Sequence, residues 1–226
     1  MSSVLPWSYS SLTAFETCPR RYYLTRVAKQ VKEPPTEATI HGNAVHKALE
    51  NAVLGAEALP EKYKQWQPIV MKVRGTPGKK LVEEKFALTS SFKPTTFFAK
   101  DAWVRGVIDL GVAGTKTAVI LDYKTGKVKV DGDQLRLFAG AAFATMPWIE
   151  RARTGYIWLA HNKVTSADYT RDDVPAIWAE FASRVQRLQV AAESDKWLPR
   201  PSGLCGWCPV GKNHCDFWKG NRGAQR

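Results

Sequence analysis

Two acidic residues and one lysine lie in strand-like segments near the middle of the chain. Residues 117–125 read TAVILDYKT, a run of β-branched and aromatic side chains that predicts a strand. Because side chains alternate along a strand, Asp122 and Lys124 share one face of it. Asp109 lies on the strand predicted just before, and pairing of the two strands would bring its carboxylate toward that of Asp122.

Converging carboxylates raise each other's pKa values unless a cation lies between them. Oxygen ligands select a hard divalent ion such as Mg²⁺ or Mn²⁺. Such an ion can activate a water molecule and shield a phosphate, and Lys124 would position that water or neutralise developing charge. The alternative is a surface Asp–Lys pair beside an unrelated aspartate. The apolar flanks of VILDY favour a functional site, because a strand exposed to solvent would carry fewer apolar side chains.

Two helical segments supply further candidates. His46 lies on the helix predicted over residues 40–53, where a neutral imidazole would complete a metal site that already has two carboxylates. A single histidine on a helix is more often structural. Gln134 and Phe138 lie four residues apart on the helix predicted over 133–144, so they share a face of it.

The four cysteines form a second candidate site. Cys205, Cys208 and Cys215 give the spacing C-x₂-C-x₆-C, which indicates a metal ion or a cluster. Cys18 is the remaining cysteine and hence the fourth thiolate, with His214 as its competitor in a Cys₃His zinc site. Four thiolates suit either zinc or a [4Fe–4S] cluster, and the spacing does not separate them. Joining the early cysteine to the late ones closes a very long loop, which favours a structural role over electron transfer.

Composition bounds the function classes. The chain has 226 residues and a formal net charge of +12, and 44% of its residues are hydrophobic, which indicates one globular domain over residues 1–226. So large a positive surplus attracts polyanions, so nucleic acid is the favoured partner and an anionic membrane surface comes second. No apolar run approaches the ~18 residues of a spanning helix, and the order of a signal peptide is missing. We therefore expect a soluble, cytoplasmic protein with no membrane partner.

The remaining pattern indicates the elements that must position these residues. A helix with Ser10 as its N-cap is expected to break at Pro19. Thr170 and Asp173 resemble a capping box at the start of a long amphipathic helix. The strand-like segments cover residues 81–89, 96–112 with a break near 100–101, 117–125 and 155–170, of which the second and third form one hairpin and the last another.

The motifs carry a resemblance when they are taken in order. G-N-A-V-H (42–46), V-I-D (107–109), D-Y-K-T (122–125) and Q-L-R-L-F (134–138) resemble the RecB-like branch of the PD-(D/E)xK nuclease superfamily. One early cysteine before a proline, followed by three near the C-terminus, is similar to the iron–sulfur members of that branch. These are the CRISPR-associated and phage RecB-like exonucleases.

The resemblance implies a fold and a cofactor. The fold would be α/β and restriction-endonuclease-like, a mixed sheet flanked by helices, with its core over residues 40–195. A subdomain from residues 8–30 and 196–218 would be closed by the four-cysteine cluster. The resemblance also favours a [4Fe–4S] cluster over zinc at Cys18, Cys205, Cys208 and Cys215.

The resemblance further implies residue roles. His46, Asp109, Asp122 and the carbonyl of Tyr123 would bind Mg²⁺ or Mn²⁺. Lys124 would be the catalytic lysine. Gln134 would contact DNA or organise the site, and Phe138 stands where the family motif has tyrosine. The family often has a glutamate on the preceding strand, for which Glu84 fits better than Glu83.

The function implied is that of a hydrolase. We expect a metal-dependent deoxyribonuclease, an exonuclease in preference to an endonuclease, that acts on single-stranded ends of DNA. The alternatives are a non-catalytic DNA-binding subunit and a zinc-stapled nucleic-acid adaptor with the same fold.

Overall fold

The computed structural model describes residues 5–128 and 132–220. The chain divides into two compact units, and the boundary between them falls within the long helix α6 (Val174–Glu193). We call residues 36–180 the sheet unit, and residues 1–35 together with 181–226 the cysteine unit. The candidate carboxylates and Lys124 belong to the sheet unit, and all four cysteines belong to the cysteine unit.

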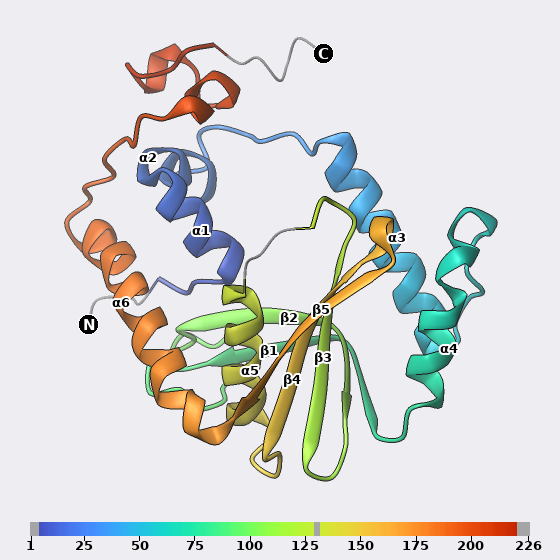
Figure 1. Ribbon diagram of the computed structural model, residues 1–226. Coiled ribbons are helices and arrows are strands. Elements are labelled where there is room, and N and C mark those ends of the chain that lie inside the picture. The colour runs from blue at the N-terminus through green and yellow to red at the C-terminus, as the bar shows by residue number, and fades with distance from the viewer. Residues whose placement is uncertain (1–4, 129–131, 221–226) are drawn as a thin grey trace. The chain divides into compact units, whose positions relative to one another are not determined.

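The sheet unit is built on a mixed sheet of five strands (Figure 1). The strands follow the chain order across the sheet, and only the pairing of β3 with β4 is parallel. A parallel pair needs a crossover connection, which here contains helix α5 (Asp133–Thr145). The predicted hairpins are confirmed as antiparallel pairs. The strands are β1 (Lys79–Leu88), β2 (Val104–Ala113), β3 (Thr117–Lys124), β4 (Arg151–Trp158) and β5 (Lys163–Thr170).

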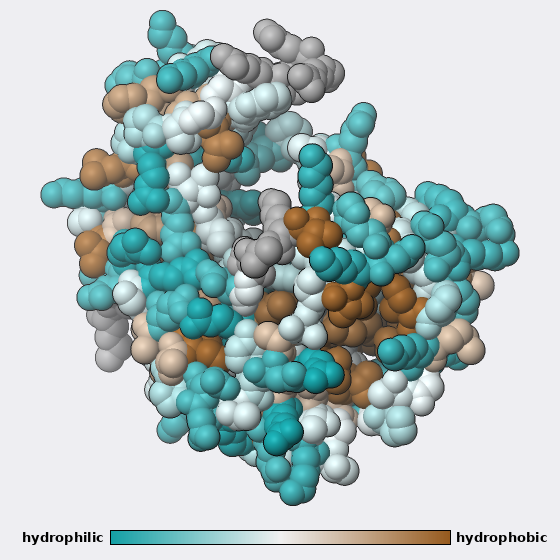
Figure 2. Space-filling model, viewed as in Figure 1, coloured by the Kyte–Doolittle hydropathy of each residue, from teal (hydrophilic) through white to brown (hydrophobic). Residues whose placement is uncertain are grey.

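Helices cover both faces of this sheet. Figure 1 shows α3 (Glu37–Leu54) and α4 (Gln67–Gly75) together on one side and α5 across the middle. Buried residues of α3 and α4 form a core with Leu110, Tyr123 and Ile157, and Figure 2 shows hydrophobic side chains gathered on that side of the sheet. On the other face, Leu135 of α5 packs with Tyr156 and Trp158 of β4. The sheet is therefore flanked by helices, as predicted.

The stretch before β2 differs from the sequence prediction. The sequence predicts strand over residues 96–112 with a break near 100–101, but residues 96–103 form turns in which Ala99 N–H donates to the carbonyl of Thr96 and Ala102 N–H to that of Ala99. Phe97 and Phe98 in this stretch contact cationic side chains instead of lining a ladder. Aromatic content alone therefore gave a wrong prediction for this stretch. β-Propensity mainly reflects how well a side chain packs on the surface of a neighbouring strand, and only weakly a preference of the backbone.

The cysteine unit is formed by both ends of the chain. Its helices include α1 (Tyr9–Thr17), α2 (Pro19–Tyr22) and the C-terminal half of α6. α1 begins two residues earlier than predicted, because Ser8, not Ser10, caps it and makes the capping box with Ser11. The break at Pro19 is confirmed. Glu16 accepts two hydrogen bonds from the Arg184 guanidinium at 2.8 and 2.7 Å, which joins α1 to α6.

Capping residues set where two of the helices begin. Thr170 and Asp173 form the predicted capping box, ahead of α6. The helix predicted over 40–53 begins earlier, at Glu37, because Thr36 accepts a hydrogen bond from Thr39 N–H and caps it. Among the residues described, no helix combines the length and the apolar content that a membrane crossing would require.

Candidate metal centre

The candidate centre lies where β2 and β3 separate. Their ladder ends at the pair Leu110–Leu121, so one further step along the register sets Asp109 opposite Asp122. At this point side chains, in place of the neighbouring strand, form the hydrogen bonds to the backbone N–H and carbonyl of Tyr123. Its N–H donates to Asp109 Oδ2 at 3.2 Å, and its carbonyl accepts from His46 Nε2 at 3.0 Å. Buried backbone groups must be paired, so the ionisable side chains replace the ladder here.

Helix α3 delivers His46 to this point. Val45 and Leu49 are fully buried on the sheet side of α3 and fix its rotation. His46 then points at the strand ends, where its Nδ1 lies 3.3 Å from Asp109 Oδ2 and its ring meets the Tyr123 ring edge-on. The imidazole thus contacts both strands that bear the candidate carboxylates.

Glu83, not Glu84, completes the group. The register of β1 with β2 pairs Val82 with Leu110 and Glu84 with Ile108, which leaves Glu83 opposite Asp109. Glu83 has a φ of 49°, in the left-handed region that is strained for a residue with a side chain. Its carboxylate, His46 and Asp109 each offer a ligand atom, and these atoms lie within 4.8 Å of one another.

Glu84 therefore does not occupy the position that the sequence analysis preferred for it. Its side chain pairs with Lys79 at 3.4 Å and is about half exposed. The reason is the register, since a shift of one residue turns a side chain to the other face of a strand. The chain pattern VEEKF contains two adjacent glutamates, and only the pairing with β2 distinguishes them.

The two glutamates provide a matched pair for testing. Glu83→Gln is expected to weaken Mn²⁺ binding by at least about tenfold, because it removes one of the two carboxylate ligands in the group. Glu84→Gln is expected to leave the affinity within about twofold, since surface ion pairs contribute little. Isothermal titration calorimetry with Mn²⁺ measures both. Equal affinities for the two variants would exclude Glu83 as a ligand.

Asp122, Lys124 and Gln134 form a closed triangle beside this group. Lys124 Nζ lies 2.6 Å from Asp122 Oδ2 and donates to Gln134 Oε1 at 3.1 Å. Gln134 Nε2 donates to Asp122 Oδ1 at 2.8 Å. The Lys124 ammonium also lies 5.0 Å from the centre of the Tyr156 ring, within cation–π range. The amine is therefore held in one position while a third of its side chain stays exposed.

The chain topology explains why these three meet. Asp122 and Lys124 face α5, while Tyr123 between them packs in the core under α3 and α4. Gln134 is the second residue of α5, so it reaches the C-terminal end of β3. Phe138, one turn further, is buried and meets Phe86 edge-on, which makes it a packing residue.

Burial raises the pKa of each carboxylate of the centre. Burial, and next the charge of Asp122, raise the pKa of Asp109 to about 8, although the Tyr123 N–H lowers it. Burial also raises the pKa of Asp122 despite the Lys124 ammonium beside it. The pKa of Glu83 is raised by burial and then by Glu50. Three carboxylic acids with raised pKa values therefore lie close together. A divalent cation bound between them would stabilise their ionised forms.

The donor set fits a hard divalent ion. It comprises one imidazole, carboxylate oxygens and the carbonyl of Tyr123, with no thiolate among them. Carboxylates and carbonyls suit Mg²⁺ and Mn²⁺, and an imidazole shifts the preference toward the transition metal. The His46–carbonyl hydrogen bond shows that both groups already converge on the same space.

The raised pKa of Asp109 predicts a pH dependence for the metal-free protein. The native state favours the protonated acid, so its stabilising contribution is complete below about pH 4 and is lost as pH rises toward about 8. In EDTA, the melting temperature is expected to fall across that range, and Asp109→Asn is expected to flatten the fall. Thermal unfolding followed by circular dichroism checks this. An equally steep fall in Asp109→Asn would assign the effect to other groups.

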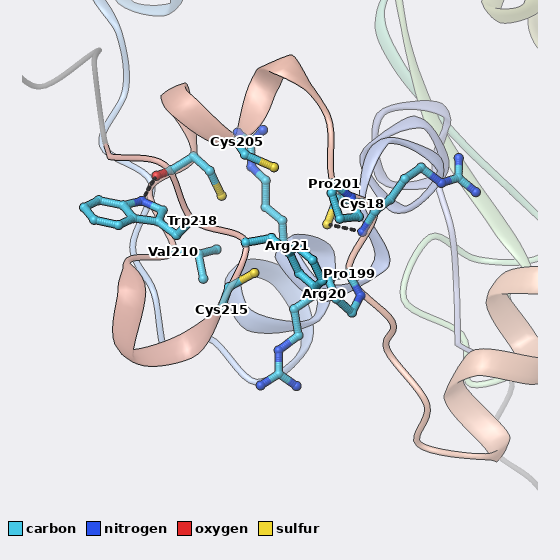
Figure 3. A pocket seen from close by; sticks show the side chains of 12 residues that line it. Cys18, Arg20, Arg21, Pro199, Pro201, Cys205, Val210, Cys215 and Trp218 are labelled. Carbon is cyan, nitrogen blue, oxygen red and sulfur yellow. Dashed lines mark hydrogen bonds between the residues drawn. The ribbon is translucent and has the colours of Figure 1, made fainter.

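The four cysteines surround one pocket within the cysteine unit. Cys18, Cys205, Cys208 and Cys215 all line it, and Figure 3 shows the sulfur atoms of Cys18, Cys205 and Cys215 around it. Backbone N–H groups of Arg200 and Ser202 donate to the sulfur atoms of Cys18 and Cys205 at 3.4 and 3.3 Å.

The predicted four-cysteine cluster is not shown as a compact group of ligand atoms in the described residues. In the described part of the chain, the group of ligand atoms within 4.8 Å of one another is the His46 group, and the cysteines form no such group. Burial raises the pKa of Cys208, while a backbone hydrogen bond with Val210 and the charge of Arg21 lower it, and the neighbouring Cys18 and Cys205 thiols make smaller contributions that raise it.

Comparison with known proteins places the chain among nucleases. Residues 6–215 match the sequence profile of the PD-(D/E)XK nuclease superfamily. No curated protein sequence matches the chain. Two crystal structures resemble its fold. A protein designated SSO0001 has a TM-score of 0.50 at 14% identity, over 95% of this chain and 87% of its own. A candidate exonuclease from Eubacterium rectale has a TM-score of 0.54 at 11% identity, over 89% and 86%.

Proposed function

Because this chain belongs to the PD-(D/E)XK nuclease superfamily, we propose that it is a Mg²⁺- or Mn²⁺-dependent exonuclease that acts on single-stranded ends of DNA. The observation that carries the proposal is the close approach of His46, Glu83 and Asp109 beside an anchored Lys124. The proposed substrate agrees with the formal net charge of +12, which attracts the phosphate backbone.

We assign the ion to His46, Glu83, Asp109 and the Tyr123 carbonyl, with Asp122 next to them. The ion would supply a Lewis acid for a scissile phosphate and a water of lowered pKa. Asp122 is the link between this group and Lys124, since its charge raises the pKa of Asp109 while its carboxylate holds the ammonium.

Lys124 and Gln134 have distinct proposed roles. The Lys124 ammonium is fixed by Asp122 and Gln134, and it would donate a charge-assisted hydrogen bond to a phosphate oxygen as negative charge develops there. Gln134 bonds both other members of the triangle, so we propose that it positions them and does not contact the reacting atoms. This differs from a direct DNA contact, because the amide oxygen and one amide N–H of Gln134 already bond within the triangle.

For the cysteine unit we propose a [4Fe–4S] cluster bound by Cys18, Cys205, Cys208 and Cys215, as in the iron–sulfur RecB-like nucleases. One observation supports a site shared by the four thiolates, since all four cysteines line one pocket. Four thiolates suit a [4Fe–4S] cluster as well as zinc, and the resemblance is the ground on which the proposal prefers the cluster.

Digestion of end-labelled DNA tests the proposed activity. Linear single strands carrying a fluorophore at either end, the corresponding duplex and a closed single-stranded circle are incubated with Mn²⁺ or with EDTA. We expect loss of nucleotides from linear single strands with Mn²⁺, slower loss from the duplex and none from the circle. Equal cleavage of circle and linear strand would show an endonuclease, and no cleavage of any substrate would favour a DNA-binding subunit.

A further inference from the structure

The turn segment before β2 presents an exposed aromatic side chain. Phe98 is 80% exposed, the highest fraction among the large hydrophobic residues that the structure describes. A single exposed apolar residue is ordinary on a protein surface. Phe98 differs because the Phe97 ring and the Arg105 guanidinium both lie against it, and Lys85 lies over the Phe97 ring.

The surroundings of Phe98 are basic and aromatic. Phe97 meets it edge-on, with ring centres 5.1 Å apart. The Arg105 guanidinium lies 6.0 Å from the Phe98 ring centre and 5.9 Å from that of Phe97, and Lys85 Nζ lies 5.5 Å from the Phe97 ring centre. We call Lys85, Phe97, Phe98 and Arg105 the aromatic platform.

The backbone beneath the platform is tied down. The Thr95 hydroxyl donates to Asp101, and the Arg105 guanidinium donates to the Ala99 carbonyl at 3.2 Å. At the start of the segment, Phe92 stacks on Trp178 with ring centres 4.8 Å apart. Hydrogen bonds and packing thus hold the segment on both sides of Phe98. The exposure of Phe98 is not the result of a loose segment.

The strands carry the platform next to the candidate metal centre. Lys85 lies two residues after Glu83 on β1, or about 7 Å along the strand. Arg105 lies four residues before Asp109 on β2, or about 13 Å. Arg105 lies an even number of residues from Asp109, so alternation along β2 sets these two side chains on the same face of the sheet.

We propose that the aromatic platform stacks an unpaired base of the DNA strand whose phosphates enter the metal centre. Aromatic rings stack on any base, while adjacent cations hold the backbone. Paired bases present no free face, so the platform selects single strands. This inference rests on the proposed nuclease function. It makes Phe98 the residue that gives the nuclease its preference for single-stranded DNA.

The test is a coupling between Phe98 and a single base. Fluorescence anisotropy in EDTA, where no cleavage occurs, gives the affinity for a labelled single strand and for strands with one abasic position each near the end. We expect Phe98→Ala and Phe98→Leu to lose on the order of tenfold in affinity and to become insensitive to the abasic position that weakens the parent. Phe98→Tyr keeps the ring and is expected to bind as the parent does.

Trp148→Ala is the matched control. Trp148 is an exposed aromatic residue that bonds the Gly114 carbonyl near the start of β3, about 23 Å along the strand from Lys124. We expect it to bind DNA like the parent. Because Phe98 is exposed, we expect Phe98→Ala to have the melting temperature of the parent. That result would exclude a folding defect as the cause of weaker binding.

The outcomes separate this inference from the proposed function. If Phe98→Ala binds as tightly as the parent and retains the abasic effect, or if the parent does not bind single strands, the platform is not a base-stacking site and serves another contact. If the coupling is present but no metal supports cleavage, the platform stands and the nuclease proposal fails. Cleavage without the coupling supports the nuclease proposal alone.

Discussion

Lys124→Ala is expected to slow metal-dependent DNA cleavage by at least about 100-fold, the range for loss of one preorganised charge donor. The Lys124 ammonium is held by Asp122 and Gln134, so its position is set before substrate arrives. A preorganised donor is most effective where charge develops, because no reorganisation is needed during the reaction. Alanine removes the donor and leaves the side chains of Asp122 and Gln134 bonded to each other.

The measurement is the initial rate of nucleotide release from a labelled single strand with saturating Mn²⁺. Affinity for DNA in EDTA is expected to change by less than about threefold, because one lysine of a strongly basic chain contributes a single phosphate contact. A loss in rate without a matching loss in affinity would mark a role in the chemical step.

The control is Lys116→Ala. Lys116 is an exposed lysine just before β3, and it pairs with Glu150 at the opposite end of the strand from Lys124. It removes the same charge without touching the centre, so it is expected to cleave at the parent rate. If Lys124→Ala also cleaves at the parent rate, the centre described here is not the active site.

Cys18→Ala is expected to cause the largest loss of stability. Cys18 lies near the start of the chain and Cys205, Cys208 and Cys215 near its end, so a shared cluster closes a loop of nearly the whole chain. In chain-entropy terms, closing a loop of that length is worth on the order of 5 kcal/mol. A typical domain has only about 5–15 kcal/mol of net stability, so the variant is expected to unfold at a much lower temperature.

Anaerobic purification separates the cluster from zinc in this experiment. The parent is expected to be brown and to contain about four iron atoms and four sulfides per chain, the composition of a [4Fe–4S] cluster. Cys18→Ala is expected to lose both the colour and the stability. Thr17→Ala, whose hydroxyl bonds the Thr13 carbonyl within α1, is the neighbouring control that keeps all four thiols.

Three results would change this interpretation. A zinc content of one per chain in the parent would replace the cluster with a single ion. A colourless Cys18→Ala with parental melting temperature would show that the cluster does not stabilise the fold. A Cys18→Ala variant that keeps its stability but loses cleavage would show that Cys18 is needed for activity and not for the fold.

The sequence alone determined the local features of the fold and the kind of site. Alternation in TAVILDYKT sets Asp122 and Lys124 on one face and Tyr123 on the other, and the structure has them so. The turn at residues 114–116 is short enough to force β2 and β3 into a hairpin, which brings Asp109 to Asp122. Such features depend on neighbours within a few residues, and these are written in the sequence itself.

Only the tertiary structure decided which residues from distant segments join them. The register of β1 on β2 selected Glu83 over Glu84, and the packing of α3 aimed His46 at the Tyr123 carbonyl. The structure also showed that residues 96–103 are turns in which Phe98 is exposed. The physical reason is that strand register and helix rotation are set by burial summed over a whole face, which no short stretch of sequence contains.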